Sequence, residues 1–207
     1  MAIYASETLL SLLLKGGWLM LPFALLSLAM VYIIVERFLV CHKYLRGSGR
    51  VLEALEGFLH KGDLEQVDYF CSQEAHLIQK VLSKGIHQSK SKHLELILKN
   101  ESEKYLSILE ENLSWLATIA GVAPMIGFLG TVIGMVQTFM AIAQEKNQVS
   151  AEIFSSGIYE AMITTVAGLI VGIIAYMGYN YFVARINQST KQLAYLINLF
   201  LTKTIVK

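Results

Sequence analysis

The sequence predicts an all-α membrane protein with three membrane-spanning helices and long cytoplasmic helical extensions. Of its 207 residues, 55% are hydrophobic and only 16% are charged, whereas about a quarter of the residues in a soluble domain are charged. Three stretches, 16–35, 112–144 and 161–184, contain no charged residue. Each is long enough to cross the hydrocarbon core, which needs about 20 apolar residues. Because backbone groups in lipid must bond internally, each stretch should be helical.

The basic residues outside these stretches predict the orientation of the chain. They are concentrated between the first two spans and after the third. Lys15 and Lys146 are the only basic residues in the N-terminal segment and in the loop before the third span. Since positively charged flanks stay in the cytoplasm, we expect the N-terminus outside and the C-terminus inside. The basic cluster follows the first span instead of preceding it, so a cleaved signal peptide is not expected.

These patterns divide the chain into consecutive segments. In order, they are an outer N-terminal segment (1–17), the first span (18–40), a cytoplasmic helical region (41–113), the second span (114–143), an outer loop (144–152), the third span (153–183) and a cytoplasmic C-terminal helix (184–207). Asp63 and Gln66 form a capping-box pattern that opens a helix. Gly85 is predicted to end a helix that begins near Glu74. Between Ile86 and Ala120 there is neither Gly nor Pro, which predicts one long helix that enters the membrane as the second span.

The second and third spans each carry a face of small and hydroxyl-bearing residues. In the second span these are Pro124, Gly127, Thr131, Gly134 and Thr138, with Gly130 nearby, and in the third they are Ala161, Thr165, Gly168 and Gly172, with Thr164 adjacent. Spacing by three or four residues places each set on one side of its helix. The opposite side of the second span is bulky and apolar, which suits lipid or neighbouring helices. Pro124 is expected to kink the second span.

Packing and proton transfer are both consistent with these faces. The G-x-x-x-G patterns at 130–134 and 168–172 allow two helices to approach closely, and packing alone explains most of the glycines. Hydroxyl groups can also donate and accept protons or hold water. Thr131 and Thr165 are therefore the first candidates for a polar path, followed by Thr164 and Thr138.

Glu160 is the acidic residue that immediately precedes the uncharged part of the third span. An ionisable group beside a membrane helix is a functional candidate by default. A carboxylate near a helix N-terminus is also favourable for stability alone, and the sequence leaves both interpretations open. No carboxylate lies deep inside any span, although a proton carrier normally needs a titratable group there. A complete proton path would therefore require a carboxylate from a partner subunit.

The sequence gives no support for an enzyme, a cofactor or a metal site. The five histidines lack metal-ligand spacing, and neither a G-x-S-x-G motif nor a P-loop occurs. A net charge of +1 provides no electrostatic reason to expect a nucleic-acid partner. Cys41 and Cys71 fall in the cytoplasmic region, where we expect them to be reduced and without a specific role.

Two blocks in the second and third spans resemble the MotA/TolQ/ExbB proton-channel family, and its ExbB/TolQ branch in particular. The first reads A-P-M-I-G-F-L-G-T-V-I-G at 123–134, and the second reads G-I-Y-E-A-M-I-T-T-V-A-G-L at 157–169. The strong part of the resemblance covers residues 116–186. A proline that the family often has in its third helix is absent, so the resemblance does not support a kink there.

The resemblance implies a bacterial inner-membrane subunit with a periplasmic N-terminus. Such subunits form a helical barrel, a homopentamer, around a dimer of an ExbD- or TolR-like single-span protein. The partner's aspartate would provide the missing carboxylate opposite Thr131 and Thr165, and Glu160 aligns with the acidic residue of the family's third helix. Proton-motive force would then work a TonB- or TolA-like protein. The sequence does not choose between TonB-dependent transport and the Tol–Pal system, although we favour the former, and protons over sodium.

Two other classes of function are alternatives to a proton channel. A non-conducting membrane scaffold would use the glycines only to assemble a bundle, so threonine-to-valine changes would be harmless while Gly130→Leu would break assembly. A stand-alone transporter is less favoured, because three spans without interrupted half-helices leave little room for a substrate site at the membrane midplane.

Overall fold

The computed structural model describes residues 20–72, 76–89, 91–144 and 151–205, and this part of the chain is helical throughout apart from short turns and joints. Its helices are α2 (Met20–Leu45), α3 (Ser48–Lys61), α4 (Leu64–Ser72), α5 (Leu77–His87), α6 (Leu94–Glu110), α7 (Leu113–Gln144) and α8 (Ala151–Ile205). The predicted all-α class is therefore confirmed. The segment expected at 1–17 and most of the loop expected at 144–152 lie outside the described residues.

Three helical stretches in the described part are long and apolar enough to cross a membrane. They lie within Met20–Lys61, Leu94–Ala143 and Gly157–Thr204. The chain folds as two compact units. One, here called the apolar unit, is Met1–Ile34 with Ser114–Tyr179, and the other, the polar unit, is Val35–Leu113 with Asn180–Lys207.

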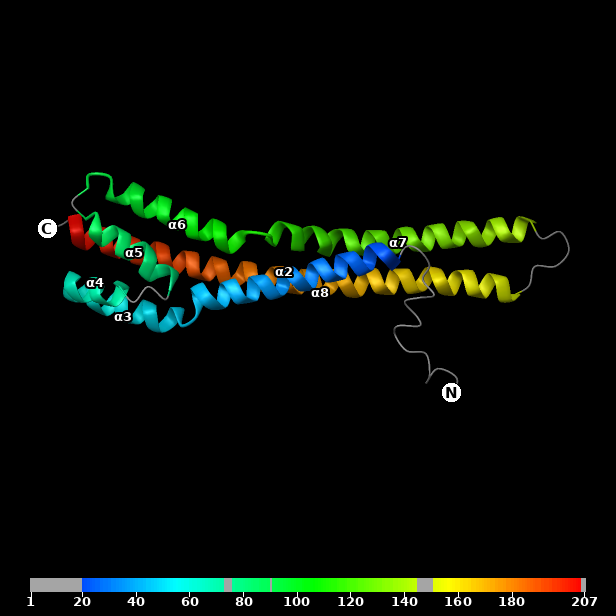
Figure 1. Cartoon of the computed structure of the whole chain (residues 1–207), viewed down its shortest axis with the longest axis horizontal. Helices are drawn as coiled ribbons and strands as arrows, with labels where there is room; N and C mark the ends of the chain where they lie inside the picture. The colour runs from blue at the N-terminus through cyan, green and yellow to red at the C-terminus, as the bar shows by residue number, and fades with distance from the viewer. Residues whose placement is uncertain (1–19, 73–75, 90, 145–150, 206–207) are drawn as a thin grey trace. The chain divides into compact units, whose positions relative to one another are not determined.

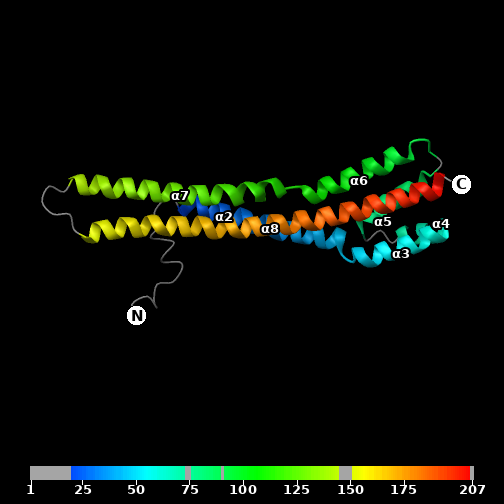
Figure 2. The same ribbon diagram turned by 180° about the vertical axis from the view of Figure 1, so that it is seen from behind.

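In the apolar unit, α7 and α8 run side by side in opposite directions (Figures 1 and 2). Contacts between them descend along α8 as they ascend along α7, from Pro124 against Gly172 to Gly134 against Ala161. Helix α2 joins this pair through Ile34, which contacts Gly178 of α8. The bulky side of α7 is exposed, with Phe128 at 67% and Met140 at 59%. This is the side that the sequence assigned to lipid or neighbouring helices.

The polar unit is built from short amphipathic helices, α3 to α6, packed in succession, together with the end of α8. Its core contains apolar residues from each of them, namely Leu55, Leu59, Val67, Leu77, Ile78, Val81, Leu82, Leu98, Leu196 and Phe200. Gly62 ends α3 with a φ of 72°, a left-handed conformation that glycine adopts without a steric penalty. Asp63 then accepts a hydrogen bond from the N–H of Gln66 at 3.1 Å, as the capping pattern predicted.

Two helix boundaries predicted for this region are wrong. Gly85 does not end a helix but lies inside α5, where a methyl group in place of its hydrogen would sit 2.6 Å from Cδ2 of Leu98. Its small size, and not its backbone freedom, is what the fold requires. The single long helix expected from 86 to 120 is interrupted between α5 and α6 and again at Glu111 and Asn112. At the second interruption Arg37 of α2 donates to the carbonyls of Ile108 and Leu109, a distant contact that local helix propensity does not encode.

A buried histidine starts α5. Nδ1 of His76 accepts a hydrogen bond from the N–H of Ile78 at 3.2 Å, and Oε1 of Gln79 accepts one from the N–H of His76 at 3.0 Å. The side chain of Gln79 also donates to the carbonyl of Phe70 at 2.8 Å. Burial lowers the pKa of His76, and the nearby carbonyl of Leu45 opposes part of that effect. The cap therefore depends on a neutral ring, because a protonated Nδ1 cannot accept a hydrogen bond.

We predict that the polar unit loses stability as the pH falls through about 6.5, the usual pKa of histidine. The pKa of His76 is lower in the folded state, so the unfolded chain binds more protons and stability is complete only above that range. His76→Asn keeps a capping acceptor that does not titrate. Thermal unfolding of the purified chain between pH 5 and 8 should show a weaker pH dependence for His76→Asn than for the wild type. Equal slopes for the two proteins would contradict this assignment.

The two cysteines are buried free thiols. Burial, together with the charge of Asp68, raises the pKa of Cys71 to about 12. Since the thiolate is the reactive form, Cys71 is an inert packing residue at neutral pH. Within the described part of the chain, no three His, Cys, Asp or Glu side chains are grouped as metal ligands.

Candidate functional site

The centre of the candidate site is a backbone-to-backbone contact between α7 and α8. A methyl group in place of the Gly168 hydrogen would lie 2.6 Å from the carbonyl oxygen of Ala123 and 3.0 Å from Cα of Gly127. One on Gly127 would lie 3.0 Å from the carbonyl oxygen of Thr164. Only glycine permits helices to approach this closely. At these glycines the backbones of α7 and α8 come into direct contact.

The same close packing continues in both directions from this centre. Gly130 lies against the side chain of Thr164, and a methyl group on Gly134 would sit 2.8 Å from Cβ of Ala161. At the other end, a methyl group on Gly172 would sit 2.6 Å from Cγ of the Pro124 ring. Pro124 is contained within α7, which continues on both sides of it. The kink predicted at this proline stays a prediction.

Four threonine hydroxyls lie along this interface, and two of them, on Thr164 and Thr165, reach from α8 to α7. Thr165 donates to the carbonyl of Gly127 at 2.9 Å. Thr164 donates to Ala161 in its own helix at 2.7 Å and also lies 3.4 Å from the Gly127 carbonyl. The other two bond within α7: Thr131 donates to Phe128 at 2.6 Å, and Thr138 donates to Gly134 at 2.8 Å.

Burial separates these threonines into two kinds. Thr164 is 2% exposed and Thr138 is 6% exposed, so both are enclosed between the helices. Thr131 and Thr165 are only half-buried. Each hydroxyl directs its hydrogen to a carbonyl and retains lone pairs that can accept another hydrogen bond. Thr131 and Thr165 can therefore accept one from outside this chain, whereas Thr164 and Thr138 serve mainly to join the helices.

Glu160 belongs to α8, but its side chain lies outside the part of the structure that is described. The role expected for it therefore rests on the sequence. Beyond it, the residues of α8 from 161 to 184 carry no charge. The candidate site, as described, offers hydroxyl and carbonyl oxygens.

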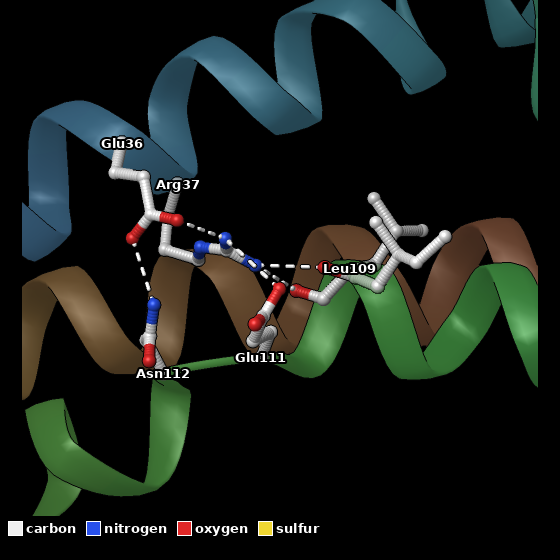
Figure 3. Close-up of polar contacts among 6 residues, drawn as sticks. Glu36, Arg37, Leu109, Glu111 and Asn112 are labelled. Atoms are coloured by element: carbon white, nitrogen blue, oxygen red, sulfur yellow. Dashed lines mark hydrogen bonds and ion pairs between the residues drawn. The ribbon is translucent and has the colours of Figure 1, made fainter.

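A second polar cluster was missed by the sequence reasoning, and it lies in the polar unit (Figure 3). Arg37 of α2 is 1% exposed and donates through Nη1 to the carbonyls of Ile108 at 2.8 Å and Leu109 at 3.4 Å. Its Nη2 lies 2.6 Å from the Glu36 carboxylate, which also accepts a hydrogen bond from the Asn112 side chain at 2.9 Å. Arg37 is one of the basic residues that follow the first span, which the sequence analysis used only to predict topology. The adjacent Glu36, at the end of an uncharged span, was the signal that it is paired.

The residues that match known proteins include both glycine faces. The profile of the MotA/TolQ/ExbB proton channel family matches residues 72–194, which is more than half of the sequence. The chain belongs to this family. Together with its three apolar helical stretches, this makes it a multi-pass membrane protein of a proton channel family.

Individual relatives within the MotA/TolQ/ExbB family carry both TolQ and ExbB names. The chain is 39% identical over 94 residues to the Tol-Pal system protein TolQ of Haemophilus influenzae, a match that covers 45% of this chain and 41% of that protein. It is 26% identical over 181 residues to the biopolymer transport protein exbB1 of Vibrio cholerae, covering 83% and 78%. An ExbB-like biopolymer transport protein of Synechocystis is 30% identical over 183 residues, covering 85% and 71%. These relatives support the ExbB/TolQ branch without separating its two roles.

Proposed function

We propose that this chain is the proton-conducting subunit of an ion-driven motor in the bacterial inner membrane. In this proposal the N-terminus is periplasmic and the C-terminus cytoplasmic. Five copies surround a dimer of an ExbD/TolR-like single-span protein. The assembly converts proton-motive force into mechanical work on a TonB-like protein, which serves transport across the outer membrane. The ion is H⁺, and no cofactor takes part.

The observation that carries this proposal is the hydrogen bond from Thr165 to the carbonyl of Gly127. It fixes a half-buried hydroxyl at the point where the backbones of α7 and α8 come closest. Thr131 lies one helical turn further along α7 and is also half-buried. Both hydroxyl oxygens retain lone pairs, so they can hold a water molecule or accept a hydrogen bond from a protonated carboxyl group.

The residues in the spans suggest which subunit binds the proton and which one orients it. The uncharged stretches 112–144 and 161–184 provide hydroxyls but no carboxylate. An aspartate on the partner's span would bind and release the proton, because a carboxylate opposite polar groups can titrate where one opposite lipid cannot. Thr165 and Thr131 would orient that carboxylate and the water beside it. Glu160 is placed at the entrance of the path in this scheme.

Work in the Tol–Pal envelope system is a second candidate role for the same machinery. The TolQ protein of Haemophilus influenzae, at 39% identity over 94 residues, favours it. In this case the partners would be TolR-like and TolA-like, and the proton path would be unchanged. Complementation of strains that lack one system or the other distinguishes the two roles.

A non-conducting scaffold is the alternative of a different class. The close packing favours it, because atoms of α8 occupy the space beside Gly127, Gly130 and Gly134. In a scaffold the threonine hydroxyls would matter only for helix packing. The two classes therefore differ in what the loss of a hydroxyl does when packing is preserved.

We predict that Thr165→Val lowers partner-dependent proton flux about 100-fold or more. The subunit should still assemble. Valine closely matches threonine in shape but cannot orient a carboxylate or water, and an oriented proton-transfer group contributes roughly 10²–10⁴-fold to a transfer rate. The measurement is proton uptake into proteoliposomes that contain this chain with its single-span partner. Native mass spectrometry of the same samples measures assembly.

Thr118→Val is the matched control, since Thr118 is an exposed threonine of α7 that donates to the carbonyl of Ser114 in its own helix. It should retain full flux. Normal flux in Thr165→Val, with normal assembly in both variants, would refute the proton path and favour the scaffold. A change in the number of partner copies would instead locate the role of Thr165 in assembly.

A further inference from the structure

The break between α6 and α7 is not dictated by the residues that form it. Glu111 has φ −52° and ψ 140°, and Asn112 has φ 61°, the one non-glycine residue with positive φ in the described chain. Neither Gly nor Pro occurs from 86 to 120, so local sequence permits a helix straight through the joint. Asparagine adopts the left-handed conformation more readily than most residues but does not require it. Something outside the joint therefore holds it open.

Arg37 replaces the backbone donors that an uninterrupted helix would provide. In such a helix the carbonyls of Ile108 and Leu109 would accept hydrogen bonds from the N–H groups of residues 112 and 113. Here the guanidinium of Arg37 donates to both carbonyls, at 2.8 and 3.4 Å. A cation at this position also interacts favourably with the C-terminal end of α6. The arginine thus satisfies the carbonyl groups that the break exposes.

Glu36, the neighbour of Arg37 on α2, holds the other side of the same break. One carboxylate oxygen lies 2.6 Å from Nη2 of Arg37, and the other accepts a hydrogen bond from the Asn112 side chain at 2.9 Å. Figure 3 shows these contacts converging from α2 on the joint. Because Arg37 is 1% exposed, its charge has no alternative solvation in this position. The open joint and the buried arginine therefore stabilise each other.

We propose that Glu36, Arg37 and Asn112 form a conformational lock that keeps α6 and α7 as two helices, and that release of the lock joins them into one. In the broken state the carbonyls of residues 108 and 109 accept hydrogen bonds from Arg37 of α2. In the continuous state they would accept them from the backbone amides of residues 112 and 113. The position of α2 thereby selects the state. The joint is a discrete two-state element, and this inference does not depend on whether the chain conducts protons.

Hydrogen exchange across the joint tests the lock in the full-length chain in lipid nanodiscs. Arg37→Met removes the guanidinium and keeps much of the side-chain volume. If the released state is a continuous helix, the amides from Asn112 to Ser114 gain intrahelical partners and exchange at least about tenfold more slowly. Arg46→Met is the matched control, since Arg46 is exposed. It should leave exchange at the joint unchanged.

A second pair of variants acts from the other side of the joint and does not remove a buried charge. Asn112→Leu disfavours positive φ and lacks the amide, whereas Asn112→Gly permits positive φ. Spin labels attached to Lys99→Cys and Thr118→Cys report whether the helix is continuous. The native cysteines are first removed by Cys41→Ala and Cys71→Ala, so that only these two sites are labelled. A straight helix places these positions about 28 Å apart, at about 1.5 Å per residue.

The proposal expects Arg37→Met and Asn112→Leu to show slowed exchange and a narrow distance distribution near that value. Arg46→Met should match the wild type in both measurements, whereas Asn112→Gly, which permits positive φ but loses the amide bond to Glu36, should fall between the wild type and Asn112→Leu. Faster exchange at the joint in Arg37→Met or Asn112→Leu would overturn the continuous-helix state. Exchange and distances that match the wild type in both variants would overturn the lock itself.

Discussion

Gly168→Ala is expected to destabilise the packing of α7 against α8 by about 3 kcal/mol, the upper end of the usual cost of overpacking. The added methyl group would lie 2.6 Å from the carbonyl oxygen of Ala123 and 3.2 Å from the backbone nitrogen of Gly127. These are backbone atoms in the interior of a helix, so neither can rotate away as a flexible side chain could. The helices must separate, and separation weakens every other contact along the interface.

Gly121→Ala provides the matched control for this substitution. Gly121 is also in α7, but nothing lies within 4 Å of a methyl group added there. Alanine at that position should be neutral, or stabilising by up to about 1 kcal/mol through its higher helix propensity. Thermal unfolding in detergent measures both variants. Equal melting temperatures for the two would show that α7 and α8 do not pack through Gly168.

Arg37→Met is expected to destabilise the polar unit by about 2 kcal/mol, in the range for a lost hydrogen bond to a charged group, because the remaining Glu36 carboxylate is 28% exposed and keeps part of its solvation. The substitution leaves the Glu36 carboxylate without its cation, and it leaves the Ile108 carbonyl without a donor wherever the joint does not close into a helix. Methionine restores part of the buried apolar volume, so the loss reflects mainly the polar groups. The effect is on stability, and it is measured separately from the exchange pattern at the joint.

Chemical denaturation, followed by circular dichroism, compares Arg37→Met with Arg46→Met. Arg46 is exposed, and substitutions at such positions usually change stability by less than about 0.5 kcal/mol. Glu36→Gln should fall between the two, because glutamine can still accept the hydrogen bond from Asn112. If Arg37→Met is as stable as Arg46→Met, the contacts drawn in Figure 3 contribute nothing to the fold.

The membrane-spanning pattern and the glycine interface could be predicted from the sequence because both depend on local features. An uncharged stretch must be helical in lipid whatever surrounds it. Small residues three or four apart define a face whose use in packing hardly depends on the partner. For this reason the sequence could place Gly127 and Gly168 on such faces. Thr165 was placed on the interface side, although its bond to the Gly127 carbonyl was not anticipated.

The failures share a different cause, which is that distant residues decided the local structure. Gly85 looked like a helix end, yet Leu98 and Phe200 require its small size in the middle of α5. Asn112 looked like a helical residue, yet it has a φ of 61° and its side chain donates to Glu36, more than seventy positions away. Helix propensity is a weak prior that tertiary contacts override. No periodicity in a single sequence reveals such contacts.

The backbone contact at Gly127 and Gly168 also limits how the protein can move. Sliding α7 along α8 by one residue would bring side chains into a space that holds only hydrogen atoms, so the two helices have a single permitted register. They must travel as one solid element. If the proposed ion-driven motion takes place, it has to move this helix pair as a whole, because the pair cannot slip internally.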